Sequence, residues 1–230
     1  MQAHIFYAVA YTACHVVVLS TLSLRPRWFA VKRELPDGSH QAGTSKAAAR
    51  IRAAAIELFA SKGYGATTTR EIAAHLGLSP GAVYPHYKTK ESLLFEISLE
   101  GHRSALAATA SADSSLSSAT DRLSSTVFAY VVWHARNQAL ARVVQHELHS
   151  LSPEHYKQIA SIRRATSQIF ARIILDGNIN TEFHTIDEEA ATLAITSLGV
   201  DVSRWFPSSG FSDPEVLAAR YVELALRMVG

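Results

Sequence analysis

The amino-acid sequence predicts an all-α protein. Its 230 residues include only seven prolines and eleven glycines, whereas alanine, leucine and arginine, which favour helices, are plentiful. Helix-start signals recur along the chain, and no stretch alternates polar and apolar residues over a length convincing for a strand. With 48% hydrophobic and 18% charged residues, the chain can bury a sizeable core. We expect an amino-terminal three-helix domain followed by a larger helical domain.

Residues 1–43 do not share this pattern. Residues 5–24 form an uncharged run of twenty residues, which four basic side chains follow. The run is long enough to cross a bilayer, but polar residues dilute it, and no positive charge precedes it as in a signal peptide. We interpret it as an extension that does not belong to the working protein, with a membrane anchor as the alternative. Residues 32–43 are typical of a flexible polar arm.

The first expected helix spans residues 44–61. Its apolar residues Ile51, Ala55, Leu58 and Phe59 fall at helical spacing and form one stripe. The glycines of the KGYG segment that follows end this helix, because glycine readily adopts the backbone conformation of a helix terminus.

Capping signals delimit the later helices. A serine or threonine with a glutamate three residues later can cap a helix reciprocally, and a serine before proline places an acceptor ahead of a residue suited to the first turn. These signals occur at Thr68 with Glu71, Ser79, Thr89, Ser152, Thr185 with Glu188, and Ser212 with Glu215. The expected helices are 68–75, 79–86, 89–110, 117–136, 138–149, 152–176, 186–204 and 213–228.

Two of these helices, 68–75 and 79–86, are short and are joined by a turn that contains Gly77, which is typical of a helix-turn-helix. Small side chains allow a helix to approach base edges, and hydroxyl, imidazole and cationic groups bind phosphate oxygens. A purely structural hairpin would not need such an outward face. We expect Ile72, Ala73, Leu76, Leu78, Val83 and Tyr87 to face inward. We expect Thr68, Thr69, Arg70, Ser79, Pro80, Gly81, Ala82, Tyr84, His86 and Lys90 to face DNA.

The distribution of charge supports binding to a polyanion. The first 92 residues hold eleven Lys/Arg and five Asp/Glu, a net charge of +6, whereas the rest hold eleven and fifteen, a net charge of −4. A basic part of this kind is suited to nucleic acid. Cys14 is the single cysteine, which excludes a disulfide framework and indicates a reducing cytoplasm.

The segment ELFASKGYGATTTREIAAHLGLSPGAVYPHYKTKESLL, residues 57–94, closely resembles the DNA-binding domain of the TetR family of transcriptional regulators. The resemblance implies a homodimer with a DNA-binding domain over 44–92 and a ligand-binding and dimerisation domain over 93–230. It also implies repression at a palindromic operator, released by a small molecule. The positions that it implies as DNA contacts are Thr68, Thr69, Ser79, Gly81, Tyr84, His86 and Lys90.

Pro85 departs from the family pattern. As the sixth residue of a helix capped by Ser79, it would delete the hydrogen bond to the Gly81 carbonyl. It would also bias Tyr84 away from helical dihedrals. Two interpretations remain open at this point: Pro85 closes a helix whose amino-terminal end does the reading, or it is a tolerated, mildly destabilising residue.

Residues 152–230 resemble the TetR regulators of acyl-CoA and steroid-ring catabolism, whose ligands are CoA thioesters. The matching features are an Arg-Arg pair on a long helix, the DGNINTEF segment and the RWFPSSGFSDPEVLAARYVELAL end. The resemblance implies an acyl-CoA effector and a dimer interface on 186–204 and 213–228. The alternatives are an uncharged apolar drug or metabolite as effector, or a helical ligand-binding sensor that does not regulate DNA.

The candidate ligand-binding residues are aromatic side chains for an apolar moiety and arginines for phosphates. Adjacent residues point about 100° apart on a helix, so only one arginine of the pair is expected to face a pocket. The candidates are Phe128, Trp133, Arg163, Arg164 and Phe170.

No motif predicts an enzyme. The sequence contains neither a phosphate-binding G-x-x-x-x-G-K loop nor a G-x-S-x-G nucleophile elbow. His146 and His149 are three residues apart and could share a metal, but no clear third ligand follows them. We therefore expect no catalytic residue, no metal site and no cofactor.

Overall fold

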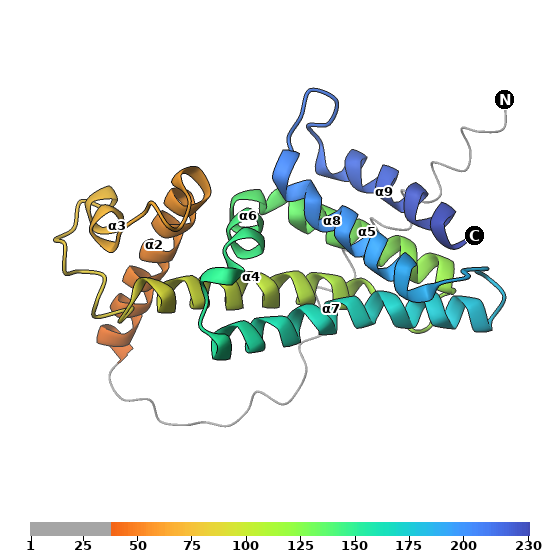
Figure 1. Cartoon of the computed structure of the whole chain (residues 1–230), viewed down its shortest axis with the longest axis horizontal. Helices are drawn as coiled ribbons and strands as arrows, with labels where there is room; N and C mark the ends of the chain where they lie inside the picture. Colours follow the sequence, from red (N-terminus) through yellow and green to blue (C-terminus); the bar gives the residue numbers. More distant parts are fainter. Residues whose placement is uncertain (1–37) are drawn as a thin grey trace. The chain divides into compact units, whose positions relative to one another are not determined.

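The computed structural model describes residues 38–230 (Figure 1). Within this range the secondary structure is helical apart from one isolated β-bridge, Ser208 to Phe211, which confirms the all-α prediction. Of the expected extension and polar arm, residues 1–43, residues 1–37 lie outside the described part of the chain. Residues 38–43, expected in a flexible arm, belong instead to the first helix. The helices are α2 (Gly38–Lys62), α3 (Thr69–His75), α4 (Lys90–Ala112), α5 (Ala119–Arg136), α6 (Gln138–His146), η2 (Leu148–Ser150, a 3₁₀ turn), α7 (Pro153–Ile179), α8 (Glu188–Trp205) and α9 (Pro214–Val229).

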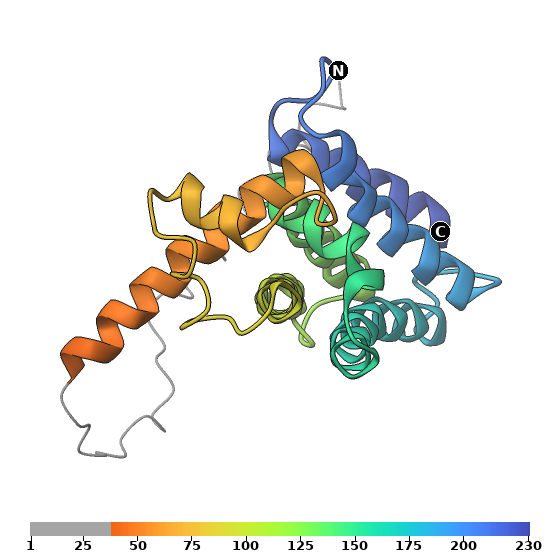
Figure 2. The ribbon, with the colours of Figure 1, turned by 60° about the vertical axis from the view of Figure 1, so that its left-hand side comes forward.

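We call residues 93–230 the body, and helix α5 lies at its centre. This helix contacts α4, α6, α7, α8 and α9. Helices α4 and α7 run side by side, as Figure 2 shows with both seen nearly end-on. Each large apolar side chain buried in this way stabilises the fold by about 1.5–3 kcal/mol. The most deeply buried of them include Leu123, Val131, Phe170, Ile173, Ile174, Val202 and Leu217.

We call residues 46–92 the head, and its apolar core extends into the adjoining part of the body. Helices α2 and α3 bury Ile51, Phe59 and Ile72 against the start of α4. The same cluster includes Val144 of α6 and Ile159 of α7, both of which are fully buried. Packing therefore holds the head against two helices of the body. A displacement of those helices would be transmitted to the head through these side chains.

Three of the expected helix caps are confirmed. The Thr68 hydroxyl accepts from the Glu71 amide while the Glu71 carboxylate accepts from the Thr68 amide, which is the reciprocal capping box. Thr89 caps α4 through the Ser92 amide, and the Ser152 hydroxyl caps α7.

The expected caps at Thr185 and Ser212 are wrong. Asp187 caps α8 through the Ala190 amide, and Asp213 caps α9. In both cases a carboxylate lies closer to the helix start, where its negative charge also interacts favourably with the helix dipole. The Thr185 hydroxyl is instead bound to the Val229 carbonyl at the end of α9.

The expected helix 79–86 is the clearest difference between prediction and structure. Residues 80–86 form successive turns, in which Ala82 donates to Ser79, Tyr84 to Gly81 and His86 to Val83. The Gly81 carbonyl, which Pro85 cannot serve, thus accepts from Tyr84 at 3.2 Å. Proline removes the donor and crowds the preceding turn, so the segment tightens instead of continuing as an α-helix.

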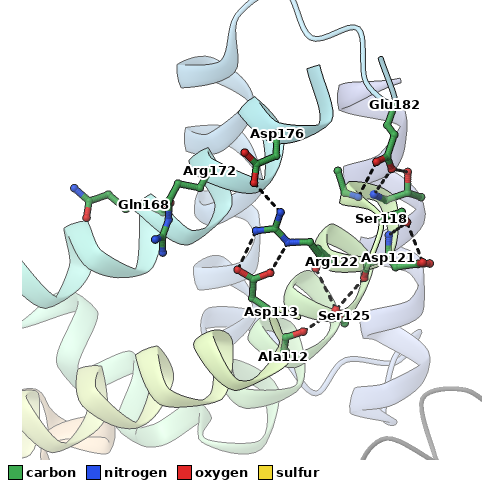
Figure 3. A network of polar contacts seen from close by, with 12 residues as sticks. Ala112, Asp113, Ser118, Asp121, Arg122, Ser125, Gln168, Arg172, Asp176 and Glu182 are labelled. Atoms are coloured by element: carbon green, nitrogen blue, oxygen red, sulfur yellow. Dashed lines mark hydrogen bonds and ion pairs between the residues drawn. The ribbon is translucent and has the colours of Figure 1, made fainter. Parts of the chain in front are cut away.

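A polar network connects the helices of the body near the carboxy-terminal end of α4 (Figure 3). The Arg122 guanidinium donates to both carboxylate oxygens of Asp113, at 2.7 and 3.2 Å, and to Asp176 at 2.7 Å. These hydrogen bonds raise the pKa of Arg122 above its ordinary value. Glu182 caps α5 by accepting from the amides of Ala119 and Thr120. The network joins the ends of α4, α5 and α7.

Within residues 38–230, no helix combines the length and the apolarity that are needed to cross a bilayer. The uncharged run at 5–24 lies outside this range.

Candidate functional site

The ten predicted DNA-facing residues are each exposed or half-buried on the head. Thr68, Arg70, Ser79 and Gly81 are exposed, and Tyr84 is 53% exposed. The predicted inward residues Ile72, Ala73, Val83 and Tyr87 are buried, but the inward placement expected of Leu78 is wrong, since it is 37% exposed.

The two halves of the helix-turn-helix meet at a pair of hydroxyl groups. The Thr69 Oγ1 and Tyr84 Oη atoms lie 3.3 Å apart, within hydrogen-bond distance. This contact brings together residues from α3 and from the turns after it, although they are fifteen positions apart. Thr69 and Tyr84 therefore present a single hydroxyl-rich surface.

Two glycines shape this surface for different reasons. Gly77 has φ of +67°, a backbone conformation that side chains other than glycine rarely adopt, so it fixes the turn. Gly81 has no atom within 4 Å of the position that a Cβ would occupy. The space beside Gly81 is therefore available to an approaching partner.

Lys90 is placed differently from the other predicted DNA contacts. Its ammonium group donates to the carbonyls of Tyr64 and Thr67, at 2.8 and 2.9 Å, and lies 4.1 Å from the centre of the Tyr64 ring. Lys90 thus holds the loop between α2 and α3 against α4. Its role at a phosphate stays a prediction.

The sequence reasoning omitted three exposed cations of the head. Lys46 and Arg50 lie four residues apart on α2, and Lys88 precedes the Thr89 cap. The spacing of Lys46 and Arg50 places both on one helix face, a signal that was available in the sequence.

The body contains a cavity of about 320 Å³ that is partly open to solvent. Five helices, α4 to α8, contribute its lining, so residues about one hundred positions apart in the sequence face the same space. The lining residues are His102, Ala105, Tyr130, His134, Gln145, His146, Arg163, Thr166, Ser167, Leu193, Thr196, Ser197, Val200, Asp201, Ser203 and Arg204.

Two buried histidines line the cavity. His102 is 5% exposed, and its Nε2 has no hydrogen-bond partner among the described residues. His134 is 1% exposed, and its Nδ1 lies 2.8 Å from the Tyr130 carbonyl oxygen. Burial, opposed in part by backbone hydrogen bonds and reinforced by the charge of Arg163, lowers the pKa of both imidazoles to about 4. Both histidines are therefore neutral near pH 7.

Arg163 is the half-buried cation of the cavity. Its guanidinium donates to the Gln145 side chain. No carboxylate of the described residues forms an ion pair with it. Asp201, the one carboxylate in the lining, is held by Arg204 through bonds of 2.7 and 3.0 Å.

The structure separates the predicted ligand-binding residues. Arg163 lines the cavity whereas Arg164 is exposed, as expected if only one of the pair faces inward. Phe170 and Trp133 lie behind the lining, where their rings contact those of Tyr130 and His134 respectively. Phe128 packs against the apolar core. Their roles in ligand binding stay predictions.

The sequence reasoning did not assign His102, Tyr130 or His134 to the site. No local motif marks these residues, because His102 and His134 lie on different helices and are brought together by packing. Their apolar neighbours gave the surrounding segments the appearance of an ordinary core.

Polar contacts join the body to the head beside the cavity. Glu147, which follows the cavity residues Gln145 and His146, accepts from the Tyr64 amide at 3.2 Å. Tyr64 is the residue whose ring and carbonyl hold Lys90. A continuous chain of contacts therefore runs from α6 to the loop that supports the helix-turn-helix.

A second contact joins α4 to the start of α7. Glu91 accepts from the Ser152 amide at 2.9 Å and lies 2.7 Å from His155 Nδ1. Burial alone would raise the pKa of Glu91, but the hydrogen bonds from Ser152 and His155 lower it below its ordinary value. The His155 ring also stacks on Phe95, with 3.7 Å between centres.

Two family models match the chain. Residues 51–97 match bacterial regulatory proteins of the tetR family, and residues 116–229 match the tetracyclin repressor-like, C-terminal domain. Among solved structures, a bacterial regulatory protein in the tetR family from Rhodococcus RHA1 is 71% identical, with a TM-score of 0.79 over 80% of this chain and 97% of that chain.

More distant relatives match about four fifths of the chain. The HTH-type transcriptional repressor KstR2 of Rhodococcus jostii (strain RHA1) is 24% identical over 198 residues, which are 83% of this chain and 95% of that protein. AibR, solved in complex with isovaleryl coenzyme A and operator DNA, is 20% identical with a TM-score of 0.69, covering 77% of this chain and 97% of its own. Two other curated relatives match over 45 and 48 residues alone, which are 16% and 26% of their lengths.

Proposed function

The chain belongs to the TetR family of bacterial transcriptional regulators, and we propose that it represses transcription by binding a palindromic operator as a dimer and leaves it when an acyl-CoA binds. The observation that carries the DNA-binding part is the exposed face of the head. Its hydroxyl groups, its open Gly81 and its cations surround the turn fixed by Gly77. Such groups position a protein on the phosphates while small residues approach the bases.

The dimer is supported by apolar side chains that the single chain leaves in solvent. Leu198 of α8 and Val216 and Leu224 of α9 are all exposed, between 39% and 53%. The neighbouring Ile195 and Leu217 are buried in the body, so each helix has an apolar face on both sides. A second copy of the chain would cover the outer faces and place two helix-turn-helix units about 34–36 Å apart, one turn of DNA.

Leu224→Glu tests this interface. The residue is 44% exposed, so the single chain tolerates the charge, but burial of that charge between two copies is unfavourable. We expect the dissociation constant of the dimer to rise at least about 30-fold, as for the loss of an interface hot spot. Analytical ultracentrifugation measures the constant, and exposed Leu116→Glu, outside α8 and α9, is the control. An unchanged constant would place the interface elsewhere.

The effector is supported by the cavity. Its volume of about 320 Å³ is smaller than a CoA thioester, so an acyl group fits inside while the nucleotide stays outside. Leu193, Val200 and Ala105 give the cavity an apolar part. The exposed Arg204, whose Nε and Nη2 bind Asp201, keeps its Nη1 as a donor for phosphates. AibR, a relative with the same fold, is solved with an acyl-CoA. The half-buried Arg163 argues against an uncharged apolar drug or metabolite.

The test combines operator selection with effector release. Random-site selection with the purified full chain should yield a palindrome, and binding to it should weaken steeply with salt. A panel of acyl-CoA thioesters should then release the DNA, while free CoA should not. A chain that selects no sequence and shows no salt-dependent affinity would contradict the DNA-binding part. Release by uncharged apolar compounds alone would contradict the acyl-CoA part.

A further inference from the structure

We propose that the inner cavity binds a carboxylate carried by the effector, held by Arg163, and that a cavity histidine takes up a proton when this carboxylate arrives. The inference rests on the proposed function in one respect, because it assumes that the cavity is the effector site. It adds the chemical class of the group that enters the cavity, namely the carboxylate of a short organic acid, either free or at the far end of an acyl thioester.

The first argument is the unbalanced charge of Arg163. A half-buried guanidinium needs a counter-charge, since burial of an isolated cation is unfavourable. Gln145 supplies only a neutral oxygen. Asp201 is already engaged by Arg204, through two hydrogen bonds. An anion from outside is therefore the missing partner, and a carboxylate matches the forked geometry of a guanidinium.

The second argument is the set of polar groups that line the cavity together with Arg163. His102 Nε2 is buried and has no partner among the described residues. The Tyr130 hydroxyl has no hydrogen bond to another described residue, although the side chain is only 6% exposed. A hydrocarbon chain would leave these polar atoms unsatisfied, which is costly in a buried site. A carboxylate has two oxygens and can accept from Arg163 and from a second donor at once.

The third argument concerns the proton. A carbonyl oxygen only accepts, so the His134 Nδ1 beside the Tyr130 carbonyl must carry the hydrogen. The Nε2 of the neutral His134 ring is then an acceptor and becomes a donor only when the ring is protonated. An incoming carboxylate supplies the negative charge that favours this protonation. The proton comes from solvent and is bound at Nε2, and no covalent bond is made or broken.

The charged and titratable groups that line the cavity come from five helices. They are His102 of α4, Tyr130 and His134 of α5, His146 of α6, Arg163 of α7, and the Asp201–Arg204 pair of α8. Since Asp201 and Arg204 neutralise each other, Arg163 is the net charge of the empty cavity at neutral pH. A bound carboxylate brings this charge from +1 to zero and offsets the repulsion that Arg163 exerts on a second cation. A histidine can then take up one proton, which returns the occupied site to the +1 of the empty cavity.

The experiment is calorimetric titration of the full chain, without DNA, with two thioesters of equal chain length. The acyl chain of glutaryl-CoA ends in a carboxylate, whereas that of pentanoyl-CoA ends in a methyl group. We expect glutaryl-CoA to bind about tenfold or more tightly. Arg163→Gln should abolish the difference, Arg163→Lys should retain part of it because the charge stays but the fork is lost, and the exposed Arg172→Gln on the same helix should retain all of it. Thermal unfolding of each variant checks that the fold persists.

Proton uptake is measured by repeating the glutaryl-CoA titration near pH 6 in buffers of different ionisation enthalpy. We expect a net uptake of up to about one proton, reduced in His102→Gln or His134→Gln. Glutarate alone serves as the second arm. If glutarate binds as tightly as glutaryl-CoA, and does so only when Arg163 is present, the bound carboxylate comes from the free acid. Inorganic phosphate is the third arm, and phosphate that binds as tightly as glutarate would overturn the preference for a carboxylate.

The outcomes separate this inference from the proposed function. Equal affinity for the two thioesters overturns the carboxylate site but leaves an acyl-CoA effector standing. Binding of glutarate with no binding of either thioester removes the acyl-CoA and supports the carboxylate. A lack of Arg163-dependent binding by every carboxylate ligand overturns the inference, whatever the chain does with DNA. Tighter binding of glutaryl-CoA without proton uptake overturns the histidine part.

Discussion

Two glycines show how the head and the body differ. Gly81 of the head has open space where a Cβ would be, whereas at Gly199 of α8 a Cβ would lie 2.6 Å from the ring of Tyr130. The room at Gly81 is left for something outside the chain. The room at Gly199 is filled by a side chain that lines the cavity. The proposed role of the head therefore depends on exposed groups around Gly81, whereas that of the body depends on side chains packed around its cavity.

The same difference appears in their polar groups. In the head, the Thr69 and Tyr84 hydroxyls face solvent. In the body, His102 and His134 are buried and are kept neutral by burial. A side chain added to the head should thus change binding and leave stability intact, while a change in the cavity lining should alter both.

The largest expected effect is that of Gly81→Leu. A Cβ at this position would have no protein atom within 4 Å, so the fold should persist, but the leucine blocks the approach to base edges. We expect operator affinity to fall to the non-specific level, a loss of about 10³-fold or more. Fluorescence anisotropy with operator DNA measures this loss. Gly210→Leu, at a position between α8 and α9 where a Cβ would also have no atom within 4 Å, is the matched control. A Gly81→Leu protein that unfolds would contradict this difference between the head and the body.

The next effect is the response of the body to acid. The pKa of His102 and His134 is about 4 in the fold and about 6.5 in an unfolded chain. The neutral rings thus contribute stability that is complete above about pH 6.5 and is lost as the pH falls toward 4, because the unfolded chain binds protons first. By pH 4.5 each histidine should cost about 2–3 kcal/mol.

Urea unfolding at a series of pH values measures this loss. His102→Gln and His134→Gln should flatten the decline between pH 6.5 and 4.5, while the exposed His184→Gln should not. Equal slopes for all four proteins would show that the buried histidines do not control acid sensitivity.

The smallest effect expected is that of Gly199→Ala. The added methyl group must displace the Tyr130 ring, and overpacking of this kind typically costs about 1–3 kcal/mol. Because Tyr130 lines the cavity, effector affinity should fall with stability. Thermal unfolding and calorimetry measure both, with Gly210→Ala as the control. A stable Gly199→Ala protein with full effector affinity would mean that the ring can move freely.

Prediction from the sequence was more successful for the head than for the body. The capping box of Thr68 and Glu71, the glycine turn at Gly77 and the inward set of the helix-turn-helix involve residues within about twenty positions of one another. Local spacing is sufficient to predict such features. The exception in the head is the helix expected over 79–86, where the effect of Pro85 was recognised but its extent was underestimated.

In the body, local patterns were less informative. Thr185 and Ser212 carried the capping pattern, but Asp187 and Asp213 cap α8 and α9. The aromatic residues Phe128, Trp133 and Phe170 were selected for their apolarity, yet the structure places them behind or beside the cavity lining. Apolar spacing predicts that a residue is buried, but not whether it faces a cavity or the protein core.

The sequence by itself determined the helical class, most helix bounds and the turn that presents the head to DNA, because these depend on hydrogen bonds and spacing within short segments. Only the tertiary structure decided which arginine of the 163–164 pair turns inward and which polar residues meet it. His102, His134 and Arg163 belong to three helices, and their distances depend on how the apolar faces of α4 to α8 pack. That packing is fixed by contacts between residues far apart in the chain, which no local pattern encodes.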